Sequence, residues 1–174
     1  RVFARGMRYL SSIWLGEADE KMFKDDLDKM RSLHINAIRI GSHVEKPRFY
    51  EMCDEMGFLV WQVFPMHYAY SDSDDLIERA SPMMREMVSM LYNRPSIVIW
   101  SVFKEPKVCP AQLPPNLYGR LCEVMRDAAR SVDPQRWVHK GDYEEGVQNV
   151  MTGLWGPRYW DYRDVFGAAA PQKV

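Results

Sequence analysis

The sequence predicts an α/β fold built on a parallel sheet. Short apolar runs of four to seven residues alternate with longer segments of helical period, and polar residues gather at the ends of several of these runs. Two architectures are typical of this alternation, an open doubly wound sheet and a closed (β/α)8 TIM barrel. No GxGxxG or GxxxxGK[ST] motif follows the first run, so the nucleotide-binding open sheets lose their best evidence. We therefore favour an incomplete TIM barrel with about six strand-helix units.

The apolar runs mark the strands, and the segments between them mark the helices. The expected strands are 2–10, 35–41, 58–64, 96–103, 136–141 and 149–155. The expected helices are 19–34, 46–57, 75–92 and 117–132. Asp19 is a typical N-cap, Pro47 suits a first helical turn and Gly57 suits a C-terminal cap. The first helix should bury Phe23, Leu27, Met30 and His34, and the third Leu76, Ala80, Met83, Met84, Met87 and Leu91.

Composition narrows the class of protein. The 174 residues fit one domain, and a formal net charge of −1 argues against nucleic acid or an anionic membrane as a partner. No apolar run is long enough for a membrane span, and the three cysteines contain no CxxC pair. Neither an initiator methionine nor a signal-peptide pattern begins the sequence, so we expect a part of a longer chain whose compartment cannot be read.

Polar and aromatic residues at strand ends are the candidates for function, because the active sites of barrels lie there. They are Arg39, Gln62, His67, Lys104, Glu105, His139, Asp142 and Trp155. A carboxyl group at an apolar barrel mouth is partly desolvated, which suits Glu105 to act as a general acid and then base. Arg39 alternates with Ile38 and Ile40, so its guanidinium should point into the barrel, where a salt bridge with Glu105 is the simplest role.

Other roles stay open for the aromatic and histidine residues. His67 and His139 either line a sugar pocket or are satisfied core residues. Trp61, Trp100, Trp155 and Trp160 either offer a carbohydrate an apolar face or pack in the core. A metal site from His43, His67, His139 and Asp142 is disfavoured, since the sequence lacks HExxH and an HxH on its first strand. No cofactor is expected, and no GxSxG marks a nucleophilic serine.

Several stretches together resemble the catalytic barrel of glycoside hydrolase family 2, which includes β-galactosidases, β-glucuronidases and β-mannosidases. "INAIRI" followed by "PRFYEMCDEMGFLVWQVF" is similar to the family's second strand, second helix and third strand, and "RPSIVIWSV" to its approach to the acid/base glutamate. The ending "VWQVF" is closer to the β-mannosidase branch. The resemblance implies one partial catalytic barrel over residues 1–174, without a second domain, and flanking β-sandwich domains in the parent chain.

The resemblance also implies roles for individual residues. Glu105 becomes the general acid/base, Arg39 orients the nucleophilic carboxylate, and Trp155 lines the sugar subsite, with a β-linked mannoside or galactoside as the carbohydrate substrate. The retaining mechanism needs a second carboxylate, which the family carries on a seventh strand. No nucleophile is therefore assigned within this chain, and residues 1–174 alone are expected to be inactive.

Lys104 departs from the family pattern, because the family usually has Asn before the acid/base residue. Lysine donates hydrogen bonds but accepts none, and its charge beside Glu105 would favour the carboxylate form. Either a subgroup makes a different contact with the sugar, or the site has left glycosidase chemistry. A carbohydrate-binding barrel without catalysis and a metal-dependent barrel hydrolase are the alternatives.

Overall fold

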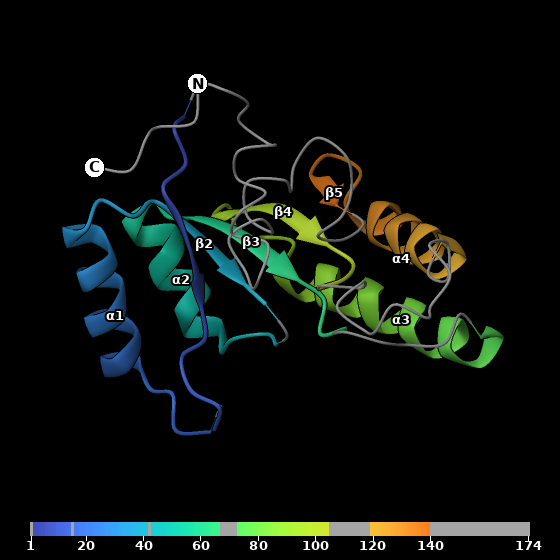
Figure 1. Cartoon of the computed structure of the whole chain (residues 1–174), viewed down its shortest axis with the longest axis horizontal. Coiled ribbons are helices and arrows are strands. Elements are labelled where there is room, and N and C mark those ends of the chain that lie inside the picture. Colours follow the sequence, from blue (N-terminus) through green and yellow to red (C-terminus); the bar gives the residue numbers. More distant parts are fainter. Residues whose placement is uncertain (1, 15, 42, 67–72, 105–118, 140–174) are drawn as a thin grey trace, which may run out of the picture.

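A computed structural model describes residues 2–14, 16–41, 43–66, 73–104 and 119–139. These residues form five strands and four helices that alternate along the chain (Figure 1). The strands are β1 (Gly6–Tyr9), β2 (Ala37–Ile40), β3 (Leu59–Val63), β4 (Ile97–Ser101) and β5 (Trp137–His139). The helices are α1 (Glu20–Ser32), α2 (Pro47–Met56), α3 (Asp74–Leu91) and α4 (Gly119–Val132). The sixth strand expected at 149–155 lies outside the described residues.

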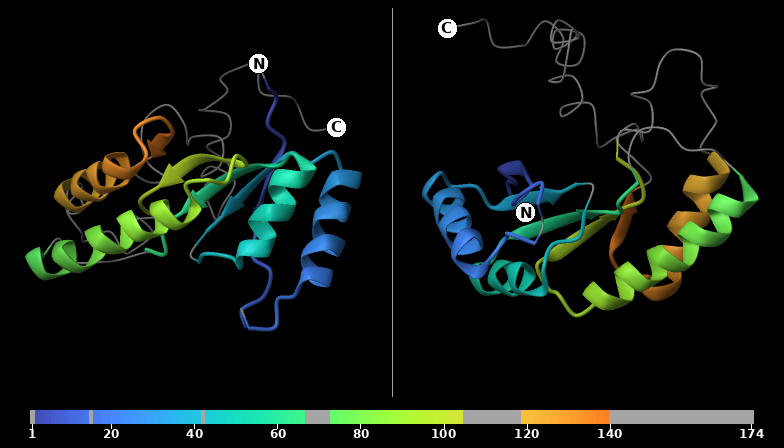
Figure 2. Two further views of the ribbon diagram at one scale, coloured as in Figure 1. Left: turned by 180° about the vertical axis from the view of Figure 1, so that it is seen from behind. Right: turned by 90° about the horizontal axis from the view of Figure 1, so that it is seen from below.

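All five strands are parallel and pair in sequence order, β1-β2-β3-β4-β5. A doubly wound sheet reverses its strand order at a switch point and carries helices on both faces. Here the order never reverses, and the helices follow one another along the outside of the sheet (Figure 2). The described residues therefore have the topology of consecutive units of a (β/α)8 barrel.

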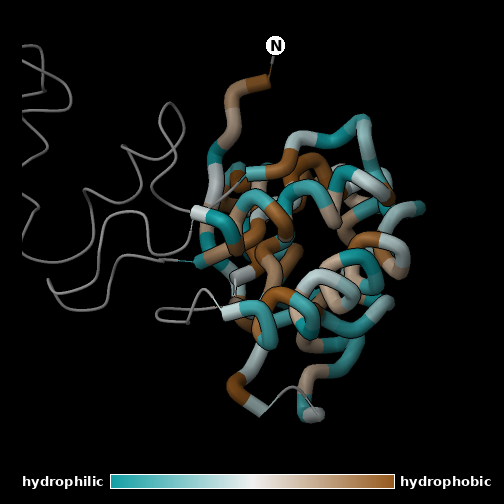
Figure 3. The backbone as a smooth tube through the Cα atoms, turned by 90° about the vertical axis from the view of Figure 1, so that its right-hand side faces the viewer, coloured by the Kyte–Doolittle hydropathy of each residue, from teal (hydrophilic) through white to brown (hydrophobic). Residues whose placement is uncertain are grey.

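The core lies between the sheet and the helices. Each strand turns alternate residues toward the helices, as the buried Ile38 and Ile40 of β2 show. Helix α2 contributes Phe49, whose ring stacks on Tyr9 at a centroid distance of 5.0 Å. Hydrophobic and hydrophilic positions alternate along the backbone trace of the helices (Figure 3). None of the described helices is long and apolar enough to cross a membrane.

Helix α1 begins as the sequence predicts and ends earlier. The Asp19 side chain accepts a hydrogen bond from the Met22 N–H at 2.7 Å, which confirms the N-cap. The expected burial of His34 on the helix face is wrong, because His34 lies beyond the helix with φ of 59° and is exposed. Its N–H donates to the Arg31 carbonyl, and the next N–H, of Ile35, donates to the Met30 carbonyl. These two bonds form a Schellman motif with histidine in the left-handed position that glycine usually fills.

Replacing His34 by glycine should raise the stability of the protein. A left-handed residue with a Cβ costs about 1–2 kcal/mol, and the extra freedom of glycine in the unfolded chain returns part of this, so we expect a gain of about 0.5–1 kcal/mol. Urea denaturation of His34→Gly against wild type measures the difference. His34→Ala is the control, and equal stability of the two variants would show that the left-handed conformation carries no strain.

Helix α3 buries a face slightly different from the expected one. Met84, Met87 and Leu91 are buried as predicted, but Met83 is 57% exposed and Ile77 is buried instead. The apolar face continues through Val88, and Met83 lies on the solvent side beside Pro82. Methionine at such a position satisfies helical spacing in the sequence without facing the core.

A bulge interrupts the pairing of β4 with β3. Val60 pairs with Ile97, whereas the next residue, Trp61, pairs with Ile99. Val98 is the extra residue and is 37% exposed. Both Val98 and Ile99 therefore turn away from the helices, and Ile97 and Trp100 turn toward them.

Asp133, just after α4, ties this helix to β4. It is buried, and its Oδ2 accepts hydrogen bonds from the Trp100 Nε1–H at 2.9 Å and from the Arg136 guanidinium at 2.7 Å. Its Oδ1 accepts from the N–H groups of Gln135 and Arg136. Burial alone would raise the pKa of Asp133, but these donors outweigh it and hold the pKa below its usual range.

Candidate functional site

Arg39 lies on the face of the sheet that turns away from the helices. In the pairing register it neighbours Arg8 of β1 on one side and Trp61 of β3 on the other. Its guanidinium carbon lies 4.7 Å from the centre of the Trp61 ring, a cation-π geometry that fixes the plane of the guanidinium. The expectation that Arg39 points to the inside of the barrel is consistent with this placement.

His139, at the end of β5, joins the same face. Its ring meets the Trp61 ring edge to face at 5.2 Å and is fully buried. Its Nδ1 lies 3.3 Å from Ser101 Oγ, and that hydroxyl donates to the Phe103 carbonyl at 3.2 Å. Because the hydroxyl hydrogen is used there, Nδ1 is the protonated nitrogen that donates to Ser101. Arg39, Trp61 and His139 thus form one continuous row of side chains on the interior face, across β2, β3 and β5, which we call the Arg39 row.

Lys104 is buried, with 2% of its surface exposed, although it follows the end of β4. Its N–H donates to the Met66 carbonyl at 2.9 Å, which extends the β3-β4 pairing past both strands. Its side chain reaches back to the end of β2, where a Cβ on Gly41 would lie 3.3 Å from Lys104 Cδ and 3.9 Å from Arg8 Nε. Because Gly41 has no side chain, the methylene groups of Lys104 can pack against its backbone.

The loop after β2 carries a buried polar pair that the sequence did not reveal as a unit. His43 Nε2 lies 2.6 Å from Glu45 Oε1, and both side chains are almost fully buried. Ser11, after β1, donates to Glu45 through its N–H at 3.3 Å and its hydroxyl at 3.0 Å. Burial opposes ionisation of Glu45, but the bonds from His43 and Ser11 outweigh it, so the pKa of Glu45 lies below its usual range.

Two of the sequence candidates face the helices instead of the interior. Gln62 accepts a hydrogen bond from the Tyr50 hydroxyl at 2.6 Å and donates to the carbonyls of His43 and Val63. Trp100 is fully buried and bonded to Asp133, so of its two open roles the packing role holds. The signal was available in the sequence, because Gln62 directly follows Trp61 and neighbouring residues of a strand face opposite sides.

The remaining candidates, Glu105, His67, Asp142, Trp155 and Trp160, lie outside the described residues. The expected contact between Arg39 and Glu105 therefore stays a prediction. Within the described ranges, no group of three or more His, Cys, Asp or Glu side chains is placed to hold a metal ion.

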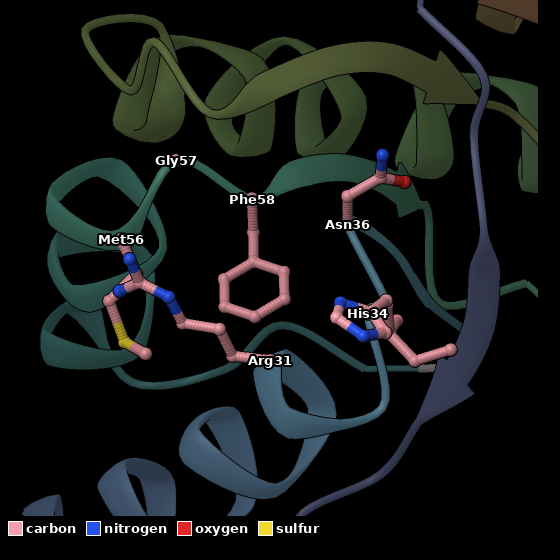
Figure 4. A pocket seen from close by; sticks show the side chains of 7 residues that line it. Arg31, His34, Asn36, Met56, Gly57 and Phe58 are labelled. Atoms are coloured by element: carbon pink, nitrogen blue, oxygen red, sulfur yellow. The ribbon is translucent and has the colours of Figure 1, made fainter.

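A cavity of about 280 Å³ lies at the other end of the strands from Arg39 and Lys104 (Figure 4). Figure 4 shows the Phe58 ring pointing from the start of β3 toward the end of α1. The lining residues are Arg31, His34, Ile35, Asn36, Met56, Gly57 and Phe58. They lie at the amino-terminal ends of β2 and β3, and the active sites of barrels lie at the carboxyl ends, so we place the candidate site at the Arg39 row.

Comparisons with known proteins point in the same direction. The family model "Glycosyl hydrolases family 2, TIM barrel domain" matches residues 16–165. A beta-galactosidase of Leuconostoc mesenteroides is 31% identical over 154 residues, which are 81% of this chain and 13% of that protein. A beta-glucuronidase of Bacteroides fragilis is 26% identical over 136 residues, which are 74% of this chain and 19% of that protein.

Among solved structures, the beta-D-mannosidase of Dictyoglomus thermophilum superposes with a TM-score of 0.72 and 24% identity. The match covers 84% of this chain and 19% of that one, and it confirms the TIM-barrel fold. The chain thus spans a fifth or less of the length of these three proteins.

Proposed function

The chain belongs to glycosyl hydrolase family 2, within the TIM barrel domain, and on this premise we propose that the complete protein hydrolyses a β-linked glycoside. The observation that carries the proposal is the family match over 16–165 together with the Arg39 row at the carboxyl ends of the strands. Relatives named beta-galactosidase, beta-glucuronidase and beta-mannosidase set the range of sugars. Within that range we retain a β-mannoside or β-galactoside as the substrate.

The proposed chemistry is retaining. Glu105 protonates the leaving oxygen as a general acid and then activates water as a base, while a second carboxylate roughly 5 Å away attacks the anomeric carbon. We propose that a later strand of the complete protein supplies this nucleophile. Arg39 would hold the nucleophile by a charge-assisted bond, with its plane set by Trp61. Residues 1–174 would then be part of the catalytic barrel, with β-sandwich domains beside it in the complete protein.

Lys104 fits this proposal in a specific way. Its stem is buried against Gly41, so the ammonium group is held at the strand ends rather than extended into solvent. From there it can donate to a sugar hydroxyl in place of the amide that the family uses. The rings of Trp61 and His139 pack edge to face at 5.2 Å on the interior face of the sheet. The roles of His67 and Trp155 in binding the sugar remain part of the proposal on the resemblance alone.

A panel of nitrophenyl β-glycosides tests the function. The complete protein should release nitrophenol from the β-mannoside or β-galactoside, and the released sugar should keep the β configuration in NMR of the first product. Sugar binding without turnover on every member of the panel would favour the non-catalytic barrel instead. Inversion at the anomeric carbon would reject the retaining mechanism.

Arg39→Lys should lower kcat/KM by about tenfold or more. Lysine keeps the positive charge but lacks the planar guanidinium, which stacks on Trp61 and can donate two parallel hydrogen bonds to a carboxylate. Steady-state kinetics on the best substrate measures the effect. Arg85→Lys, at an exposed position of α3, is the matched control, and equal losses in both variants would contradict the role of Arg39.

A further inference from the structure

The imidazole of His43 faces hydrogen-bond acceptors on both sides. Nδ1 lies 3.1 Å from the Gly41 carbonyl, and Nε2 lies 2.6 Å from Glu45 Oε1. A carbonyl oxygen cannot donate, so Nδ1 must carry a hydrogen. A neutral imidazole carries only one, and its Nε2 lone pair would then face the carboxylate oxygen at close range. The short contact is favourable only if one further proton sits between the two groups.

That proton belongs to His43, because Glu45 is held as a carboxylate. Oε1 and Oε2 together face three donors: His43 Nε2 and the N–H and hydroxyl of Ser11. A carboxylate accepts all three bonds, and these donors hold the pKa of Glu45 below its usual range, so the proton between the two groups lies on the His43 side. The pair is therefore imidazolium and carboxylate, with every polar atom of both side chains engaged.

The pair connects three strand ends. Ser11 follows β1, His43 and Glu45 follow β2, and the Glu45 N–H donates to the Tyr50 hydroxyl of α2 at 3.1 Å. That hydroxyl donates to the side-chain oxygen of Gln62 in β3, and the side-chain amide of Gln62 donates to the His43 carbonyl at 2.9 Å. The closed circuit lies directly after β2, and its first member, His43, is four residues beyond Arg39. A network satisfied throughout is rigid, and one with a missing member leaves several buried groups unpaired.

We propose that the proton between the two groups makes His43 an imidazolium paired with the Glu45 carboxylate, and that this ion pair positions β2 so that Arg39 stacks on Trp61. Both are positioning residues, since their polar atoms contact protein groups. The proposal rests on the proposed function only where it links this geometry to turnover. Among the described residues, the titratable groups that face Glu45 are Tyr9 from β1 and Tyr50 and Cys53 from α2, and the charged groups Arg8 and Lys104 lie beside Gly41.

NMR of the complete protein, selectively labelled with ¹⁵N-histidine and ¹⁵N-tryptophan, tests the protonation state. At pH 7.5 both nitrogens of His43 should carry protons in wild type. Glu45→Gln keeps an acceptor but removes the charge, so the His43 ring should lose one proton and the Trp61 indole resonance should shift. Ser11→Ala keeps both charges and should leave His43 doubly protonated, and it serves as the second variant if Glu45→Gln folds poorly.

Asp28→Asn is the matched control, because it removes a carboxylate from an exposed pair with Lys24 on α1. It should change neither resonance. A singly protonated His43 in wild type would overturn the proposal, and so would an unmoved Trp61 resonance in Glu45→Gln. If the protein hydrolyses glycosides, Glu45→Gln should also lose about 10- to 100-fold in kcat/KM, as expected for a small displacement of a catalytic array. Absence of turnover in wild type would reject the proposed function and leave the NMR test intact.

Stability against pH provides a further measurement with a defined sign. The carboxyl of Glu45 titrates near 4.5 in an unfolded chain, and its folded pKa is lower. The stabilisation from its ionised form is therefore complete above about pH 4.5 and is lost as the pH falls through the folded pKa. The Tm difference between wild type and Glu45→Gln should therefore shrink as the pH falls below about 4.5. A difference that grows as the pH falls below about 4.5 would contradict an ionised Glu45.

Discussion

Glu105→Gln in the complete protein should lower kcat by about 10²–10⁴-fold on a glycoside with a poor leaving group, because general acid-base catalysis supplies about that much. Glutamine can neither protonate the leaving oxygen nor accept a proton from water. The loss should be far smaller in the first step for a dinitrophenyl glycoside, whose leaving group departs without protonation. Stopped-flow kinetics on both substrates measures the contrast.

Glu86→Gln is the control for this experiment. Glu86 is exposed on α3 and lies on the helix layer, so its replacement should leave both rates unchanged. Circular dichroism should show the same fold for both variants. Activity of Glu105→Gln equal to wild type on the poor substrate would remove Glu105 from the mechanism and favour a non-catalytic barrel.

Asp133→Ala should have the largest effect on stability, a loss of about 2–4 kcal/mol. The substitution removes the acceptor of the buried Trp100 indole and the charge that faces Arg136. An orphaned buried donor costs about 1–3 kcal/mol, and an uncompensated guanidinium adds to that, although solvent reduces its share because Arg136 is partly exposed. Urea denaturation followed by tryptophan fluorescence measures the change.

Asp127→Ala provides the comparison, since Asp127 also carries a carboxylate on α4 but is 70% exposed. It should change the free energy of unfolding by less than about 0.5 kcal/mol. Asp133→Asn separates charge from hydrogen bonding, because asparagine can still accept from Trp100. If all three variants were equally stable, the tie between α4 and β4 would be energetically unimportant.

The sequence predicted the elements well where local chemistry decides them. Asp19, Pro47 and Gly57 all serve the helix ends at which they were expected, and Gly57 has the left-handed φ of 75° that its role requires. His34 was missed because spacing alone continued the helix, whereas the chain had already turned into a left-handed cap. Glycine is the residue that usually indicates such a turn in a sequence, and here histidine occupies its position.

The site was predicted less completely, for a physical reason. Strand alternation placed Arg39 on the interior face, and its neighbour in the register proved to be Trp61. The His43–Glu45 pair depends on Ser11, which is 34 residues away from Glu45 in the chain. Only the pairing of β1 with β2 brings the two loops together, and periodicity within one segment carries no information about that contact.

The bulge at Val98 determines how β4 should be compared with related strands. If Val98 were counted as an ordinary strand residue, strict alternation would assign Ile97 and Ile99 to the same side and exchange the environments of all residues that follow. An alignment of β4 with a regular strand that leaves no gap for Val98 would thus assign Trp100 to the barrel interior and Ser101 to the core. Grafting of a relative's acid/base segment onto this strand must therefore be aligned from Ile99 onward, with Val98 counted as the extra residue.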